Sequence, residues 1–329
     1  MLVVAVIGDG SWATALVKIL SDNQIRVNWW MRDVENMAFI QSHNFNGKYL
    51  PSARLQTNTI KFCPDIHLAI AEATAIIYAI PAAFLADAIE PLTPSEVQGK
   101  LLVSAIKGME PSTDLIISDY FLHRFKVPST SIAAIAGPCH AEEVATEKLS
   151  YLTLSSESNA TATALAPLFR RPNIYTSTLG DIRGVEFAAV LKNIYAIAAG
   201  IANGLGKGDN FKAVLISSAC AEMKRFLQAV VPVNRELTHS VYLGDLLVTA
   251  YSQHSRNRNF GNMIGHGYSV RSAQLEMNMI AEGYYASKSI HHLLKEYEVS
   301  MPICEAVYNI LYEKISPVVE FEMLKGQLA

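Results

Sequence analysis

Apolar residues in the first half of the chain gather in short runs, which alternate with longer amphipathic stretches. The runs are rich in Val, Ile, Tyr and Ala, and several lack the apolar-polar alternation of a half-exposed strand. Such runs are typical of parallel strands that are covered on both faces of a sheet. We predict strands at residues 2–7, 24–31, 59–62, 75–80, 101–105, 132–136 and 151–155.

Helical patterns separate these predicted strands. Their positions are residues 11–21, 65–73, 82–89, 113–125 and 161–169. Strand-helix alternation of this kind predicts a doubly wound α/β fold, with helices on both faces of the sheet.

The pattern changes near residue 180, where the strand-like runs stop. Helices are predicted at 184–201, 210–229, 246–250, 269–278, 282–297 and 301–314, and polar loops at 204–208, 239–243 and 252–267. A chain of 329 residues is long enough for two domains. We therefore predict an α/β domain over residues 1–182 and an all-helical domain over 183–329.

Composition narrows the classes of partner and compartment. A net charge of -3 gives no reason to expect nucleic acid or an anionic membrane as a partner. The four cysteines form no CxxC pair, so we expect neither a metal site nor a disulfide framework. The first apolar run is too short for a signal peptide or a membrane span. We expect a cytoplasmic protein without a membrane span.

The segment from Gly8 to Ala13 (GDGSWA) has the GxGxxG/A form, and it follows a predicted strand and opens a predicted helix. Gly8 permits a tight turn, Gly10 lets backbone N–H groups approach a pyrophosphate, and Ala13 allows the helix to pack closely on the strand. Because this is the context that the motif requires, we predict a dinucleotide-binding site here.

The second predicted strand ends near Arg32 and Asp33, where dinucleotide folds place a residue that contacts the ribose. Arg32 would suit the 2′-phosphate of NADP, whereas Asp33 would suit the 2′-hydroxyl of NAD. The alternative is a helix-capping Asp beside a solvated Arg. The sequence leaves the choice between NAD and NADP open, with a slight preference for NADP.

Lys192 lies inside an apolar, alanine-rich predicted helix. A Lys in this position must reach water, find a partner or lose its proton. Small neighbours such as Ala188 and Ala189 would let a ligand approach closely. Asp245 begins another predicted helix, as its N-cap or as the charge partner of a buried Lys.

Other polar groups stand where ligands of α/β proteins bind. Lys107 follows a predicted core strand, as does the segment 137–143 (GPCHAEE), although a surface Lys or a helix-capping His would look alike. Ser255, Arg256 and Asn257 lie in the predicted polar loop. Their donors suit a phosphate group, and the alternative is a solvated basic loop.

Taken together, these segments resemble the bacterial NAD(P)-dependent glycerol-3-phosphate dehydrogenase family. The similarity runs over nearly the whole chain, and eight segments carry it in order: 8–16 (GDGSWATAL), 49–51 (YLP), 107–110 (KGME), 137–143 (GPCHAEE), 191–193 (LKN), 243–249 (LGDLLVT), 255–261 (SRNRNFG) and 281–284 (AEGY).

This resemblance implies a Rossmann-type N-terminal domain, a helical C-terminal domain and reversible hydride transfer between sn-glycerol 3-phosphate and dihydroxyacetone phosphate. It implies synthesis of glycerol 3-phosphate for phospholipids. By position, Lys192 matches the general acid/base of the family. The implied substrate contacts are Lys107, Gly137, Cys139, Lys192, Asp245, Ser255, Arg256 and Asn257. The implied cofactor contacts are Gly8, Gly10, Ser11, Trp12, Arg32, Lys107, Ala141, Arg256, Ile280 and Glu282.

Two positions depart from the family pattern. Ala13 stands where the family usually has Gly, and Cys139 where it usually has Ser or Thr. A thiol donates a weaker hydrogen bond than a hydroxyl, so the backbone of Cys139 is a better candidate for substrate contact than its side chain.

The implied chemistry needs a Lys that exchanges its proton near the operating pH. Burial of Lys192 and the charge of Lys107 would lower the pKa of the amine, whereas Asp245 would raise it.

Two other functions remain possible from the sequence: that of a related two-domain hydroxy-acid dehydrogenase, and that of a regulator that binds a dinucleotide without catalysis. The oligomeric state is open, and a homodimer is the commonest default.

Overall fold

The computed structural model describes residues 2–277 and 279–328, which divide into two compact units. The first unit comprises residues 1–106 and 117–182, and the second comprises 107–116 and 183–329. The main break between Ile182 and Arg183 coincides with the expected boundary. The segment from Lys107 to Ile116 instead groups with the helical unit, which the sequence does not predict.

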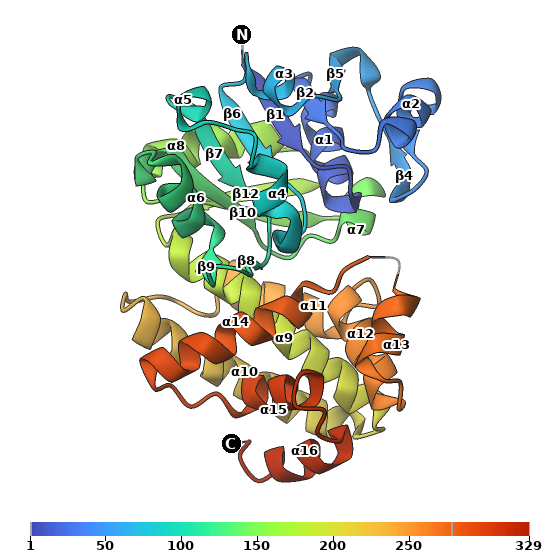
Figure 1. The fold of residues 1–329 in the computed structure, drawn as a ribbon, viewed down its shortest axis with the longest axis vertical. Coiled ribbons are helices and arrows are strands. Elements are labelled where there is room, and N and C mark those ends of the chain that lie inside the picture. Colours follow the sequence, from blue (N-terminus) through green and yellow to red (C-terminus); the bar gives the residue numbers. More distant parts are fainter. Residues whose placement is uncertain (1, 278, 329) are drawn as a thin grey trace. The chain divides into compact units, whose positions relative to one another are not determined.

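The first unit is built on an eight-stranded sheet with the order β12-β11-β10-β7-β6-β1-β2-β5 (Figure 1). Its strands are β1 (Val3–Ile7), β2 (Arg26–Trp30), β5 (Ile60–Cys63), β6 (Ala75–Tyr78), β7 (Leu101–Ser104), β10 (Ile132–Ala136), β11 (Ser150–Ser155) and β12 (Ile174–Leu179). All pairings are parallel except β10 with β11. The doubly wound fold is therefore confirmed, with the correction that β11 and β12 run opposite to the other strands.

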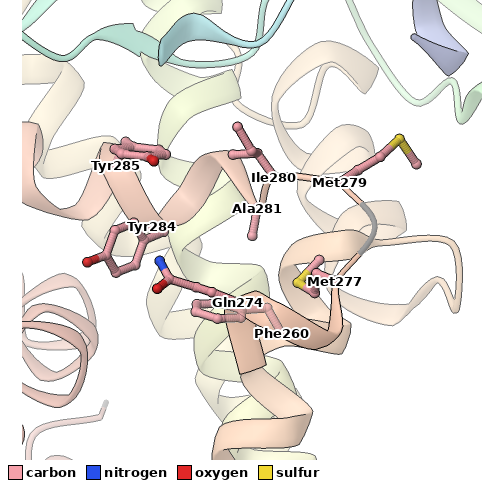
Figure 2. Close-up of a pocket in the computed structure, with 8 residues that line it drawn as sticks. All are labelled: Phe260, Gln274, Met277, Met279, Ile280, Ala281, Tyr284 and Tyr285. Carbon is pink, nitrogen blue, oxygen red and sulfur yellow. The ribbon is translucent and has the colours of Figure 1, made fainter. Parts of the chain in front are cut away.

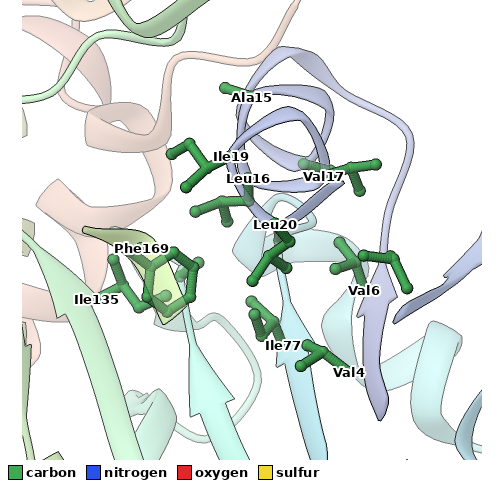
Figure 3. Close-up of a cluster of buried hydrophobic side chains, with 14 of the residues drawn as sticks. Val4, Val6, Ala15, Leu16, Val17, Ile19, Leu20, Ile77, Ile135 and Phe169 are labelled. Atoms are coloured by element: carbon green, nitrogen blue, oxygen red, sulfur yellow. The ribbon is translucent and has the colours of Figure 1, made fainter. Parts of the chain in front are cut away.

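Helices and short strands cover and extend this sheet. They are α1 (Ser11–Asp22), α2 (Val34–His43), α3 (Ile66–Ile70), α4 (Leu85–Ile89), α5 (Pro94–Val97), α6 (Ile117–Phe125), α7 (Ala141–Ala145) and α8 (Asn159–Leu165), with the hairpin of β3 (Phe45–Asn46) and β4 (Leu50–Arg54). α1 packs against the sheet through Leu16 and Leu20, which face Val4, Val6 and Ile77 (Figure 3). This apolar core holds the start of α1 at the end of β1.

The second unit is helical apart from one short hairpin, β8 (Met109–Glu110) with β9 (Leu115–Ile116). Its helices are α9 (Ile182–Gly204), α10 (Gly208–Val230), α11 (Asp245–Tyr251), α12 (Arg256–Gly265), α13 (Val270–Glu276), α14 (Glu282–Tyr297), α15 (Pro302–Leu311) and α16 (Pro317–Leu324). The predicted helix over 113–125 is present from Ile117 to Phe125 as α6, and only its start is wrong. There the Glu110 carboxylate accepts hydrogen bonds from the backbone N–H groups of Ser112 and Thr113 and thereby forms the turn of the hairpin.

α9 runs through the middle of the helical unit (yellow-green in Figure 1). It is long and apolar enough to cross a membrane by length and hydropathy, but its apolar window is wholly buried in the folded protein. A helix that is apolar on all sides is expected at the centre of a helical core. The predicted helix over 184–201 is thus confirmed as the central element of this unit.

The predicted loop over 252–267 is wrong in its larger part, since α12 occupies most of it. Ser255 is the N-cap of α12 and its hydroxyl oxygen accepts a hydrogen bond from the backbone of Arg258 at 3.3 Å. Arg256 and Asn257 therefore lie in the first turn of a helix, where unpaired N–H groups and the helix dipole favour an anion.

A buried carboxyl group supports α15 in the same unit. Glu222 of α10 is 1% exposed, and its Oε1 accepts a hydrogen bond of 2.6 Å from the backbone N–H of Ile303 in the first turn of α15. Burial raises the pKa of Glu222 to about 7. The folded protein therefore favours the protonated carboxyl group across a pH range in which the unfolded chain has already lost that proton.

We expect the free energy of unfolding to fall as the pH rises from the unfolded pKa of Glu222 through its folded pKa. The loss should approach about 3 kcal/mol. In Glu222→Gln the amide oxygen can still accept the bond from Ile303, so this variant should lack that part of the pH dependence. Chemical denaturation of both proteins at a series of pH values measures the difference, and parallel curves would contradict it.

Candidate functional site

The loop that joins β1 to α1 has the geometry of a phosphate-binding turn. Gly8 has φ of +127°, and a β-carbon there would lie 2.5 Å from the carbonyl oxygen of Ala79. A β-carbon on Gly10 would meet no atom within 4 Å. β1 also lies where the strand order reverses, between β2 and β6. Ligands of doubly wound sheets bind at this switch point.

Buried side chains hold the carbonyl groups of this loop. The indole Nε1 of Trp29 donates to the carbonyl oxygen of Gly8 at 2.6 Å. The carboxamide of Asn46 donates to the carbonyl oxygen of Asp9 at 2.9 Å and to the hydroxyl oxygen of Thr14 at 2.8 Å. The sequence does not predict these roles of Asn46 and Trp29. Both side chains bond to a loop that is distant from them in the chain, and no local motif indicates such a contact.

The start of α1 has features that suit a dinucleotide. The first N–H groups of a helix have no acceptor within the helix itself, and the N-cap residue, Gly10, provides no side-chain cap. Ser11 is 1% exposed, and its hydroxyl has no hydrogen-bond partner among the described residues. A buried unpaired hydroxyl beside open space fits a bound polar group such as a phosphate.

At the end of β2, the side chains of Arg32 and Asp33 have different partners. Asp33 caps α2 through a bond of 3.0 Å from the backbone of Asn36, and it pairs with Lys48 at 2.7 Å. The bond from Asn36, together with that from Lys48, lowers the pKa of Asp33. The guanidinium carbon of exposed Arg32 lies 5.7 Å from the ring centroid of Phe84. The capping alternative for Asp33 is therefore correct.

The turn after β10 contains three further predicted residues of the first unit. Gly137 has φ of +114°, and a β-carbon there would lie 2.6 Å from the carbonyl oxygen of Tyr151. The Cys139 thiol donates to the carbonyl oxygen of Gly137 at 3.1 Å. Ala141 is the first residue of α7. The Cys139 thiol thus donates within its own turn, which fits the expectation that the backbone of Cys139 is the better candidate for substrate contact.

In the helical unit, Lys192 and Asp245 form a buried ion pair. Lys192 is 4% exposed and Asp245 is 1% exposed. The Nζ atom of Lys192 contacts Oδ1 of Asp245. The other carboxylate oxygen of Asp245 lies 3.4 Å from Nζ of Lys107. One carboxylate therefore bridges two ammonium groups, and the charge-partner alternative for Asp245 is correct.

Local structure aims these three side chains at one another. A π-helical turn, Ser240–Gly244, directly precedes Asp245, and the hydroxyl of Thr249 donates to the carbonyl oxygen of Asp245 at 2.6 Å. π-Helical turns are rare in proteins and are frequent at functional sites. Asn193 donates to the backbone carbonyl of Lys107 at 2.7 Å, which ties the start of the hairpin to α9.

The start of α12 is linked directly to the start of α14. Oδ1 of Asn257 accepts a hydrogen bond of 2.9 Å from the backbone N–H of Gly283, next to Glu282. Ser255 and Asn257 are buried and Arg256 is half-buried. Ser255, Arg256 and Asn257 thus share one helical turn that offers several hydrogen-bond donors.

A pocket of about 330 Å³ lies between α12, α13 and α14 (Figure 2). Phe260, Tyr284, Tyr285 and Ile280 contribute to its lining, which is largely apolar. Ile280 is one of the predicted cofactor contacts. Because it lines this pocket, it lies beside an accessible space rather than in the core.

Two family models match most of the chain. The family model described as the N-terminus of NAD-dependent glycerol-3-phosphate dehydrogenase matches residues 3–162, and the model described as its C-terminus matches residues 181–322. The chain belongs to this family.

Individual relatives extend the similarity over nearly the full chain. Glycerol-3-phosphate dehydrogenase [NAD(P)+] of Chlorobium limicola is 37% identical over 94% of this chain and 93% of its own length. The Bacillus subtilis protein of the same name is 36% identical over 98% and 94%. The crystal structure of glycerol-3-phosphate dehydrogenase from Coxiella burnetii superposes with a TM-score of 0.92, at 28% identity and 98% coverage of both chains.

Proposed function

We propose that this protein is an NAD(P)-dependent sn-glycerol-3-phosphate dehydrogenase. It would interconvert sn-glycerol 3-phosphate and dihydroxyacetone phosphate. Family membership supports the reaction class. The observation that carries the assignment to this chain is the buried ion pair that Lys192, on the apolar helix α9, forms with Asp245 of α11. An enzyme that moves a proton needs a shielded, oriented amine of this kind.

Bound NAD(P) would supply the acceptor or donor of the hydride. The open space at Gly10 and the unpaired hydroxyl of Ser11 support pyrophosphate binding at the start of α1. We propose that the contacts in the first unit are Gly8, Gly10, Ser11, Trp12, Arg32 and Ala141, and those in the second are Lys107, Arg256, Ile280 and Glu282.

Lys192 would transfer the proton of the substrate hydroxyl. In the direction of alcohol oxidation the neutral amine accepts this proton, and in the reverse direction the ammonium donates it to the carbonyl oxygen. Asp245 orients the amine and offsets the charge of both lysines. Lys107 adds a positive charge that favours negative charge developing on the substrate oxygen.

The first turn of α12 would hold the substrate phosphate. Arg256 offers a planar set of donors, Ser255 and Asn257 add further polar groups, and the helix dipole has its positive end here. Binding energy from this non-reacting group can fix the carbonyl carbon for hydride transfer. The backbone around Gly137 and Cys139 would provide further substrate contacts.

Arg32 should make the enzyme prefer NADPH, because Asp33 is occupied as a cap and by Lys48. We expect Arg32→Ala to lower kcat/KM for NADPH by about 10- to 100-fold, the value of a charged hydrogen bond, with little effect on NADH. Steady-state kinetics with both cofactors measure this. Arg26→Ala, an exposed position at the start of the same strand, is the control. An equal loss with both cofactors would contradict the role.

The cellular role would be to supply glycerol 3-phosphate for glycerophospholipid synthesis in the cytoplasm, from a small-molecule substrate and without a membrane span. We retain a homodimer as the default assembly.

A substrate panel tests the proposed function. The purified protein should oxidise NADPH or NADH rapidly with dihydroxyacetone phosphate and slowly with 2-keto acids. Preference for a keto acid would instead identify a hydroxy-acid dehydrogenase. A folded protein that binds NADPH but reduces neither class would be a regulator, and either result would refute the proposal.

A further inference from the structure

Glycines bring α9 and α12 into direct backbone contact. Each helix carries two glycines four residues apart, Gly200 and Gly204 on α9 and Gly261 and Gly265 on α12. A β-carbon on Gly200 would overlap the carbonyl oxygen of Arg258, and one on Gly261 would overlap that of Ile197. Glycine is a poor helix former, so glycines at all four of these contact positions indicate a steric requirement.

The same close contact continues one turn further along both helices. A β-carbon on Gly204 would lie 2.5 Å from the carbonyl oxygen of Asn262, and one on Gly265 would lie 2.5 Å from that of Ile201. Contacts on both helices advance together along the chain, so the two helices run in the same direction. The start of α12 is therefore on the side of α9 that leads back toward Asn193 and Lys192.

A third helix closes this arrangement beside Lys192. A β-carbon on Gly283 of α14 would lie 2.7 Å from the carbonyl oxygen of Asn193. The backbone N–H of Gly283 also donates to Asn257 in the first turn of α12. α9, α12 and α14 are thus joined around the Lys192–Asn193 segment by contacts that leave no room for a side chain.

We infer that these glycine contacts set the separation between the Lys192 amine and the phosphate-binding turn of α12, and that the enzyme thereby selects substrates by the length of chain between carbonyl and phosphate. The inference rests on the proposed function, which places the proton transfer at Lys192 and the phosphate at Ser255, Arg256 and Asn257. Gly200, Gly261 and Gly283 are then positioning residues. They touch no substrate, but they fix the two groups that do.

The test compares dihydroxyacetone phosphate with its homologue that has one additional methylene between carbonyl and phosphate. The wild-type enzyme should favour the shorter substrate by about 10- to 200-fold in kcat/KM. Gly261→Ala should push α12 away from α9. We expect kcat/KM for the natural substrate to fall by about 10²-fold while that for the homologue changes by less than about threefold.

Gly200→Ala acts from the opposite helix and should shift the ratio of the two kcat/KM values in the same direction. It also serves if Gly261→Ala does not fold. Gly326→Ala is the matched control, because its β-carbon would lie 3.8 Å from the nearest neighbour. A general loss of structure would lower both kcat/KM values together and leave their ratio unchanged.

The outcomes separate this inference from the proposed function. A wild-type enzyme that fails to reduce dihydroxyacetone phosphate refutes the proposed function. A wild-type enzyme that reduces it but does not discriminate by length overturns the inference alone, with no variant needed. The inference is likewise overturned if the folded glycine variants keep the wild-type ratio.

Discussion

Replacing Lys192 by Ala should lower kcat by about 10²- to 10⁴-fold, the usual contribution of a general acid or base. The buried amine is held against Asp245, and a methyl group can neither accept nor donate the proton. Lys107 still pairs with Asp245 in the variant, so the carboxylate is not left without a partner. Steady-state reduction of dihydroxyacetone phosphate at saturating cofactor measures the loss.

Lys288→Ala is the matched control for this experiment. Lys288 is an exposed lysine on α14 of the same unit, and its removal should leave kcat unchanged. Thermal denaturation of both variants would show that each is folded. A Lys192→Ala enzyme that is folded and within about tenfold of the wild-type kcat would rule out the proton-transfer role.

Replacing Arg256 by Ala should lower kcat/KM for dihydroxyacetone phosphate by about 10²- to 10⁴-fold. Each charge-assisted hydrogen bond contributes about 1.5 to 3 kcal/mol, and a guanidinium can form two with one phosphate. At saturating cofactor, the same substitution should have little effect on unphosphorylated dihydroxyacetone, because that substrate never used these bonds. The ratio of the two losses is therefore the informative quantity.

Arg258→Ala supplies the control within the same helix. Arg258 carries the same charge in the same helix, so its removal tests whether net positive charge alone explains the effect. We expect a small change that is similar for both substrates. Equal losses with phosphorylated and unphosphorylated substrate in Arg256→Ala would refute the phosphate role.

The sequence predicted the elements whose pattern is local. β10 and α14 match the predicted ranges, since an unbroken apolar run and a clear helical period leave little choice. Lys192 was identifiable because a single amine on an apolar helix demands a partner. The sequence offered Asp245 as that partner but did not decide the role, since Asp245 is distant in the chain and a carboxylate at a helix start also fits a capping role.

The elements that the sequence did not predict depend on contacts with segments that are distant in the chain. The first residues of α12 are rich in Arg and Asn, a composition typical of loops, and the helix is stabilised by its close packing on α9. β12 is an edge strand of Tyr, Thr and Ser whose pairing with β11 is not visible in its own sequence. Asn46 supports the phosphate-binding loop from a separate hairpin, so no motif marks it.

The most direct test of the central claim is to follow the hydride itself. Incubation with dihydroxyacetone phosphate and NADPH that carries deuterium at the transferable position should give sn-glycerol 3-phosphate with one deuterium on C2, detected by mass spectrometry. Lys192→Ala should form the same labelled product far more slowly. A folded protein that binds NADPH and forms no labelled glycerol 3-phosphate would contradict the account.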